Sequence, residues 1–192
     1  MSANSLPRAP VIESALELAR IWCSGHMIDG APALGHAIKV ARKVYEHLPS
    51  APLDLLAAVI VHDSPYFAPA DIDLDAVLTN ALSRRAAQIV RAIEAEHEAL
   101  DRNDSVAVDT RDREALIASA ADKVISISSV VGRGRRASDP DAYWRERSAF
   151  TSRVPYFQHF AAISTAYLPC ELAVELTAVV AFAAETTTPY RE

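Results

Sequence analysis

Glycine, cysteine and long apolar runs are all scarce in this sequence, and each scarcity excludes a class of protein. There are five glycines in 192 residues, and alternating β-branched runs are almost absent, so no real sheet is expected. Cys23 and Cys170 lie far apart and form no CxxC pair, which excludes a zinc ribbon or disulfide framework. We interpret both cysteines as small buried hydrophobes. The longest apolar stretch, 173–184, is interrupted by Glu175 and is too short to cross a membrane.

The net charge limits the classes of partner that we expect, and the N-terminal residues indicate the cellular location. The formal net charge is −6, and a general nucleic-acid binder needs clustered Lys and Arg, so nucleic acid is excluded as a partner. A small anionic ligand needs only a local positive site and is not excluded. The first residues lack the basic start and apolar middle of a secretory signal. We therefore expect a cytoplasmic protein without a membrane anchor.

Alanine, leucine and helical periodicity dominate what the sequence does contain. The length suits one domain. We predict an all-α, single-domain bundle of about eight to ten helices over residues 1–192, with 1–10 flexible and with loops at 101–112 and 132–141. Glycine or proline is expected to end several helices, notably at Gly132 and Pro155. The predicted helices span 11–26, 33–48, 51–62, 73–80, 83–100, 113–131, 142–153, 156–167 and 171–185, with a turn at 29–32.

His62-Asp63 is the most informative dipeptide in the chain. It follows the apolar run 55–61 and precedes Ser64-Pro65, where proline disfavours helical geometry. A carboxylate in such surroundings must find a partner or stay protonated, and a metal ion is an effective partner. Adjacent helical side chains point about 100° apart. Both therefore reach one ion only if it lies beyond the helix end.

Asp122 and His36 complete a set of candidate metal ligands. Asp122 lies within IASAADKVISI, which otherwise indicates a helix buried on most sides, and acidic residues are rarely buried unless paired. His36 lies one turn into its predicted helix, on the face that adjoins Ala37 and Val40. Two imidazoles and two carboxylates favour Mn, Fe, Zn, Co or Mg over a metal that prefers thiolates.

The order of these residues resembles the HD superfamily of metal-dependent phosphohydrolases. A histidine is followed by a His-Asp pair and then by a single aspartate in an apolar helix. The resemblance is closest to RelA/SpoT-type and small alarmone hydrolase domains, and it covers most of the chain. It is carried by ALELARIWCSGHMIDGAPALGHAIKVA, AAVIVHDS, ALIASAADKVISI and the downstream YWRERS.

The resemblance implies a site, a cofactor and a reaction. The metal ligands would be His36, His62, Asp63 and Asp122, and they would hold one divalent ion, foremost Mn. Asp63 and Lys123 would be the catalytic residues, with Lys123 orienting phosphate. The substrate would be a nucleotide or another small phosphoester, and a guanine nucleotide cleaved by a (p)ppGpp 3′-pyrophosphohydrolase-like reaction is one candidate.

Several positions depart from the family pattern. Tyr66 and Phe67 replace the acidic pair that usually handles the nucleophilic water, so Asp71 or Asp73 is a candidate replacement acid. Ile28 replaces a basic residue that contacts the nucleotide, and Ser126 replaces a common asparagine. A domain that binds metal or nucleotide without turnover is therefore the main alternative. A purely structural helical protein and a metal-dependent oxygenase are further ones.

The remaining polar clusters have simpler interpretations. We read EAEHEALD, which contains His97, as an exposed helix face, and Cys23 with His26 as a core thiol beside a helix-end histidine. His47 and His159 show no partner. A loop carries Arg133, Arg135 and Arg136 and is either an anion clamp or simply solvated. The apolar stripe 172–180 is core, or the face of a homodimer.

Overall fold

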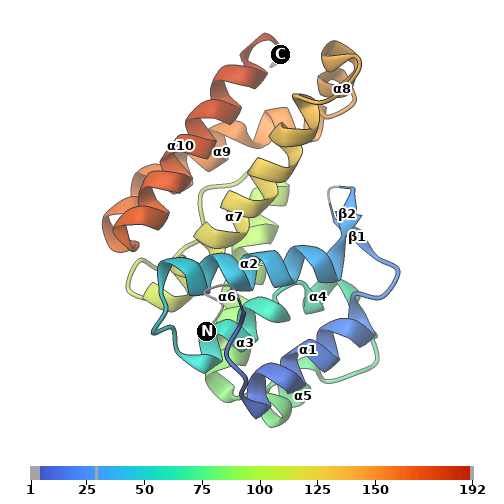
Figure 1. The fold of residues 1–192 in the computed structure, drawn as a ribbon, viewed down its shortest axis with the longest axis vertical. Coiled ribbons are helices and arrows are strands. Elements are labelled where there is room, and N and C mark those ends of the chain that lie inside the picture. The colour runs from blue at the N-terminus through green and yellow to red at the C-terminus, as the bar shows by residue number, and fades with distance from the viewer. Residues whose placement is uncertain (1–4, 29, 191–192) are drawn as a thin grey trace.

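The computed structural model describes residues 5–28 and 30–190. Its regular elements are helices, apart from one short two-stranded antiparallel sheet (Figure 1). The predicted all-α bundle is confirmed. Residues 1–4 of the predicted flexible segment and Asp29 of the predicted turn lie outside the described residues. The elements are α1 Pro10–Trp22, β1 Met27–Ile28, β2 Ala31–Pro32, α2 Ala33–His47, α3 Leu53–Ile60, α4 Ser64–Phe67, α5 Leu74–Ala81, α6 Arg84–Arg102, α7 Arg113–Gly134, α8 Pro140–Arg145, α9 Ser148–Ser164, α10 Cys170–Thr187, and the 3-10 turns η1 Thr165–Tyr167 and η2 Thr188–Tyr190.

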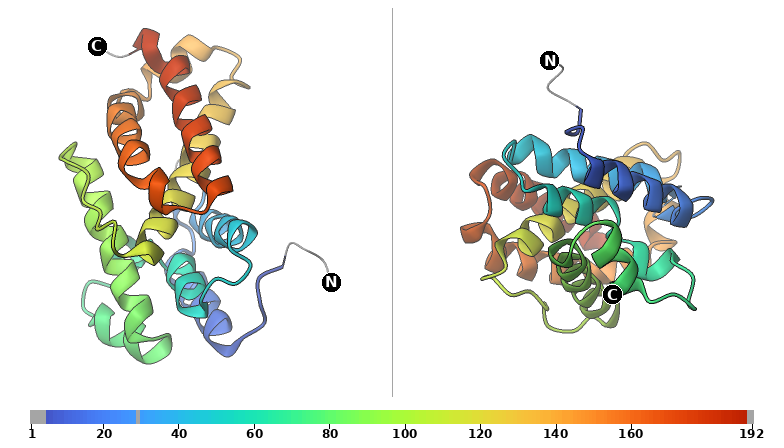
Figure 2. Two further views of the ribbon diagram at one scale, coloured as in Figure 1. Left: turned by 90° about the vertical axis from the view of Figure 1, so that its left-hand side faces the viewer. Right: turned by 90° about the horizontal axis from the view of Figure 1, so that it is seen from below.

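Helix α7 is the central element of the bundle. It contacts α2, α3 and α6 on one side of the molecule and α8, α9 and α10 on the other. Figures 1 and 2 show α9 and α10 at one end of the molecule and α1, α3 and α5 at the other. α7 is also the one described helix that is long and apolar enough to cross a membrane, but 72% of its most apolar window is buried within the protein, as in the core helix of a bundle.

Helix α3 is the most buried element near the candidate site. Every residue from Leu55 to Ile60 has no exposed surface, because α1, α2 and α6 cover it. A helix that is apolar on all sides is stable only in such surroundings. The continuous apolar run in the sequence therefore places α3 inside the bundle. The turn that follows Ile60 is buried as well, so its side chains lie in the protein interior.

Side-chain caps set the starts of four helices. The side chains of Asp73, Ser83, Asp112 and Asp139 each accept a hydrogen bond from the backbone N–H three residues later. Such caps satisfy an N–H group that has no partner within the helix. The Asp73 carboxylate caps α5 and does not line the cavity described below, so its position does not suit a replacement acid.

Two predicted helix ends prove wrong at glycine positions. α1 ends at Trp22 rather than near residue 26, because Gly25 has a φ of +77° that a helix cannot continue through. α7 continues through Gly132 to Gly134. A Cβ atom on Gly134 would lie 2.5 Å from Cζ2 of Trp144, so this glycine permits close packing of α8. The loop predicted at 132–141 shrinks accordingly to the residues between α7 and α8.

The prediction that Pro155 separates two helices is also wrong. Pro155 lies inside α9, although its ring removes one backbone donor. Val154, Tyr156 and Phe157 on both sides of it are buried, and their packing holds the helix together. Both cysteines were predicted to be buried, and the prediction is right for Cys23 but wrong for Cys170, which is exposed at the start of α10.

Candidate metal centre

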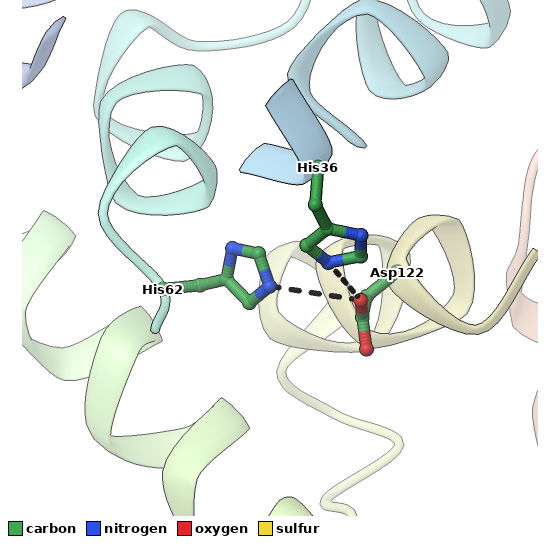
Figure 3. Close-up of side chains that lie close together, drawn as sticks. All are labelled: His36, His62 and Asp122. Atoms are coloured by element: carbon green, nitrogen blue, oxygen red, sulfur yellow. Dashed lines mark ion pairs between the residues drawn. The ribbon is translucent and has the colours of Figure 1, made fainter. Parts of the chain in front are cut away.

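Three elements that are distant in the sequence bring His36, His62 and Asp122 together (Figure 3). His36 lies in the first turn of α2, and Asp122 lies in the middle of α7. His62 lies in the turn after α3, where the chain leaves helical geometry before Pro65. The turn at residues 61–63, between α3 and α4, therefore directs the imidazole into the bundle. Ser64 and Pro65 are the first residues of α4, so the prediction that proline excludes helical geometry at this step is wrong, because proline is tolerated in the first turn of a helix.

The ligand atoms of these three residues all lie within 4.8 Å of one another. His36 Nε2 is 2.9 Å from Asp122 Oδ1, and His62 Nε2 is 3.6 Å from the same oxygen. All three residues are buried, with exposed fractions of 6% or less. The described residues thus contain a cluster that could hold a metal ion, in agreement with three of the four predicted ligands.

The fourth predicted ligand, Asp63, lies beside this cluster. Its Oδ1 atom is 3.4 Å from His62 Nε2, and the residue is 6% exposed. Its Oδ2 atom is buried and has no hydrogen-bond partner. A buried carboxylate oxygen without a partner is costly, and a cation would remove that cost.

The hydrogen bonding of His62 leaves one ring nitrogen directed at the cluster. Nδ1 lies 2.7 Å from the Val59 carbonyl oxygen, which can only accept, so Nδ1 donates. The Nε2 atom is buried and has no partner that meets hydrogen-bond criteria. A backbone bond to one nitrogen commonly orients the other toward a metal. The orphaned nitrogen and the orphaned Asp63 oxygen both fit a divalent cation.

The carboxylates perturb the pKa of His62. Burial lowers the pKa of this imidazole, but Asp63 and Asp122 outweigh burial and raise it to about 9. For Asp122, burial raises the carboxyl pKa, yet hydrogen bonds from the neighbouring histidines lower it well below the usual value. Without a cation, His62 therefore carries a proton that balances the carboxylates.

His97 belongs to this centre, contrary to the prediction that it lies on an exposed face. Its Nε2 atom is 3.1 Å from Asp122 Oδ2, and its side chain is 14% exposed. Ser126 also donates to this carboxylate, at 3.3 Å from Oδ1. His97 stands among acidic residues in the sequence, and such surroundings are typical of an exposed helix face. The signal available in the sequence was the apolar stripe of α6, because buried Ile93 precedes His97 by four residues and therefore lies on the same helix face.

Lys123 and Glu96 form a buried ion pair beneath the centre. Lys123 is 2% exposed and Glu96 has no exposed surface, so the exposed reading of this part of α6 is wrong. Lys123 Nζ contacts Glu96 Oε2 and lies 4.5 Å from the ring centroid of Phe160. Tyr156 donates to Glu96 Oε1 at 2.7 Å. Lys123 also lines the cavity described below, and its ammonium group is paired with Glu96.

A cavity of about 660 Å³ opens beside the centre. Its wall includes His36, Asp63, His97 and Asp122, together with an apolar side. Tyr66 and Phe67, which stand where the resemblance leads one to expect acids, both line it, and Phe67 stacks on His26 with ring centroids 4.4 Å apart. Neither Asp71 nor Asp73 is among the lining residues. Apolar members of the wall are Ile28, Tyr66, Phe67, Leu100, Ile127, Val130, Phe150 and Phe157.

The other predicted candidates divide between the cavity and the surface. Arg133 lines the cavity, whereas Arg135 lies over the Phe182 ring at 5.4 Å. His47 does have a partner, because its Nε2 atom is 2.8 Å from Glu175 Oε2. His159 is exposed.

No protein-family model matches this sequence, and no curated protein matches it either.

Proposed function

We propose that the chain is a metal-dependent phosphohydrolase of the HD type that acts on a nucleotide or another small phosphoester. The observation that carries the proposal is the convergence of His36, His62 and Asp122 within 4.8 Å, with His36 and Asp122 at the wall of a cavity. Asp63 would complete the ligand set. The mixed nitrogen and oxygen donors suit one divalent ion, foremost Mn, with Fe, Zn, Co or Mg as alternatives.

The residues of the centre have distinct tasks in this proposal. His36, His62, Asp63 and Asp122 would hold the ion, and the ion would supply Lewis-acid chemistry by lowering the pKa of water and polarising a phosphate oxygen. Val59 fixes the orientation of the His62 ring through its carbonyl group. His97 and Ser126 hold the Asp122 carboxylate from its two oxygens. The apolar wall excludes bulk water and offers a surface for a base or another flat group.

Elemental analysis and a substrate screen test the proposal together. Protein purified without chelator is expected to retain close to one divalent ion per chain and to cleave a phosphorylated substrate only when loaded. The screen includes guanosine tetraphosphate, mononucleotides and generic phosphodiesters. Asp63→Asn should abolish turnover, while His159→Ala, an exposed histidine, should not change it. Metal-loaded protein that cleaves none of these compounds would overturn the proposal.

A ligand-binding role without turnover is the second candidate, and Tyr66 and Phe67 favour it. Both line the cavity where the resembling hydrolases carry the acids that handle water. In that case nucleotide and metal should raise the melting temperature, with no product formed. Turnover that Asp63→Asn removes would exclude this candidate.

A further inference from the structure

Helix α10 is apolar on the side that faces solvent as well as on the side that faces the core. Within the stripe 172–180, Leu172 and Leu176 have no exposed surface, so they belong to the core. On the other side of the helix, Val174 is 64% exposed and Phe182 is 38% exposed. Only one side of α10 is therefore used by the packing of the single chain.

The outer face of α10, defined here as Val174, Ala178, Ala181 and Phe182, is a continuous apolar strip. All four residues are exposed, and spacings of four, three and one residues place them on one side of the helix. Figure 2 shows α10 along the outside of the molecule, with α9 beside it. Burial of such a strip against a partner would remove apolar surface from water.

One end of the outer face is positively charged. Arg135 Cζ lies 5.4 Å from the centroid of the Phe182 ring, and both Arg135 and Arg136 are exposed. Among the described residues, no carboxylate lies within 4.0 Å of either guanidinium group. Glu185 follows Phe182 by about one turn, and two guanidinium groups against this one carboxylate leave the end positive.

The other end of the outer face is negatively charged. The Glu171 side chain is 86% exposed, and its Oε2 atom comes only within 3.9 Å of His47 Nδ1. Lys43 Nζ lies 2.9 Å from Glu175 Oε1 and 3.1 Å from Glu46 Oε2, so these two carboxylates share one ammonium group. Three carboxylates against a single lysine leave this end negative.

Opposite charges at its two ends make the outer face complementary to itself when two copies pack antiparallel. A two-fold axis between Ala178 and Ala181 places the positive end of one copy against the negative end of the other. A parallel pair would instead bring like charges together. The small alanine side chains at the centre allow the two helix axes to approach to about 8 Å.

We propose that the outer face of α10 binds the same face of a second copy of this chain, with the two α10 helices antiparallel. Arg135 of each copy then lies near Glu171 of the other copy. None of the outer-face residues lines the cavity of the metal centre, so the inference does not depend on the proposed function.

The size of the outer face sets the strength of this dimer. The 18 residues of α10 span about 27 Å, and a face roughly 10 Å wide therefore offers several hundred Å². A standard interface buries about 800 Å² on each partner. The dimer is thus a weak one that dissociates in the micromolar range and that forms and separates with protein concentration.

Sedimentation velocity from about 1 to 500 µM protein tests the dimer. Wild type should change from monomer to dimer across this range, whereas Ala178→Glu should stay monomeric because it puts a charge at the centre of the interface. Ala76→Glu, at an exposed alanine of α5 at the other end of the molecule, is the matched control and should behave as wild type. Wild type that stays monomeric, or a dimer that survives Ala178→Glu, would overturn the inference.

Charge reversal tests the pairing between the two ends. Glu171→Arg and Arg135→Glu should each weaken the dimer at least about tenfold, because each contact occurs twice about a two-fold axis. The variant that carries both changes should return to within about threefold of wild type. Circular dichroism melting confirms that each variant is folded, and this series decides if Ala178→Glu does not fold. A double variant as weak as the single ones contradicts the inference.

Cys170 provides a probe of the helix orientation. It is exposed, whereas Cys23 is buried, so a nitroxide label attaches to Cys170 alone. In the antiparallel dimer the two labels should lie roughly 30 Å apart, because Cys170 is near opposite ends of the paired helices. A parallel pair would bring the labels within about 15 Å of each other. Electron-spin distance measurement separates these cases, and the shorter distance would rule out the proposed arrangement.

Discussion

His97 Nε2 lies 3.1 Å from Oδ2 of Asp122, on the opposite carboxylate oxygen from the one that faces His36. The carboxylate thus lies between imidazoles supplied by α2 and α6. Its orientation is fixed from both sides, which is what a metal ligand requires if it is to be in place before the ion arrives.

His97→Ala should weaken metal retention without removing the centre. Loss of a group that orients a metal ligand typically costs about 10- to 100-fold in metal affinity. The measurement is a competition titration against a chelator of known affinity. His159→Ala is the matched control and should leave affinity unchanged, because His159 is exposed. Equal affinity of the His97 variant and wild type would show that His97 only fills space.

His62→Ala and Asp122→Asn should each reduce bound metal to background. Both side chains contribute ligand atoms to the cluster of three, so either change leaves only two of those ligands. Elemental analysis of each purified variant measures the effect. Full metal content in either variant would place the ion elsewhere in the protein.

The stability of chelated protein should fall as the pH rises through about 9. The pKa of His62 is raised from 6.5 to about 9 in the folded protein because, although burial lowers it, Asp63 and Asp122 raise it more. A raised pKa means that the protonated ring stabilises the fold fully below pH 6.5, and that this stabilisation is lost above 9. Urea unfolding at several pH values measures the slope. His62→Gln should flatten it, and an equally steep slope in that variant would assign the titration to another group.

Metal affinity should move in the opposite direction over the same range. His62 must lose its proton before Nε2 can bind an ion, so affinity should rise with pH until about 9. Calorimetry in buffers of different ionisation enthalpy counts the protons released on binding. Release of no proton near neutral pH would mean that His62 is already neutral there.

Lys123→Met should destabilise the protein strongly. It leaves the Glu96 carboxylate buried without its cation, and loss of one member of a buried pair typically costs about 3 to 5 kcal/mol. Chemical unfolding measures the loss. The double variant Lys123→Met with Glu96→Met should lose less than Lys123→Met alone, because no charge is then buried. A larger loss in the double variant would show that packing around Phe160, not charge, controls this region.

Gly134→Ala and Gly132→Ala should have opposite effects. A methyl group on Gly134 would collide with the Trp144 ring at 2.5 Å, and overpacking of this kind costs about 1 to 3 kcal/mol. At Gly132 the nearest atom belongs to the flexible Arg136 side chain at 3.5 Å, so alanine should stabilise the helix by up to about 1 kcal/mol. Thermal melting of both variants measures the difference.

Local patterns in the sequence determined most of the helices and the pair His62-Asp63 at a helix end. Apolar periodicity and the end of the apolar run 55–61 both act within a few residues, so they can be read without knowledge of the fold. Asp122 was a candidate because it lies in an otherwise apolar helix, and His36 joined it as a predicted ligand through the resemblance to the HD superfamily.

Only the tertiary structure decided which polar residues of α6 face inward. Glu96 and His97 stand among charged residues, and their sequence surroundings are those of a solvated helix. They face inward because Lys123 on α7 pairs with Glu96 and the Asp122 carboxylate on α7 lies within hydrogen-bond distance of His97. Pairing of that kind depends on residues that are distant in sequence, and no local pattern encodes it. The position of Arg133 beside the cavity has the same origin, since it follows from how far α7 continues past Gly132.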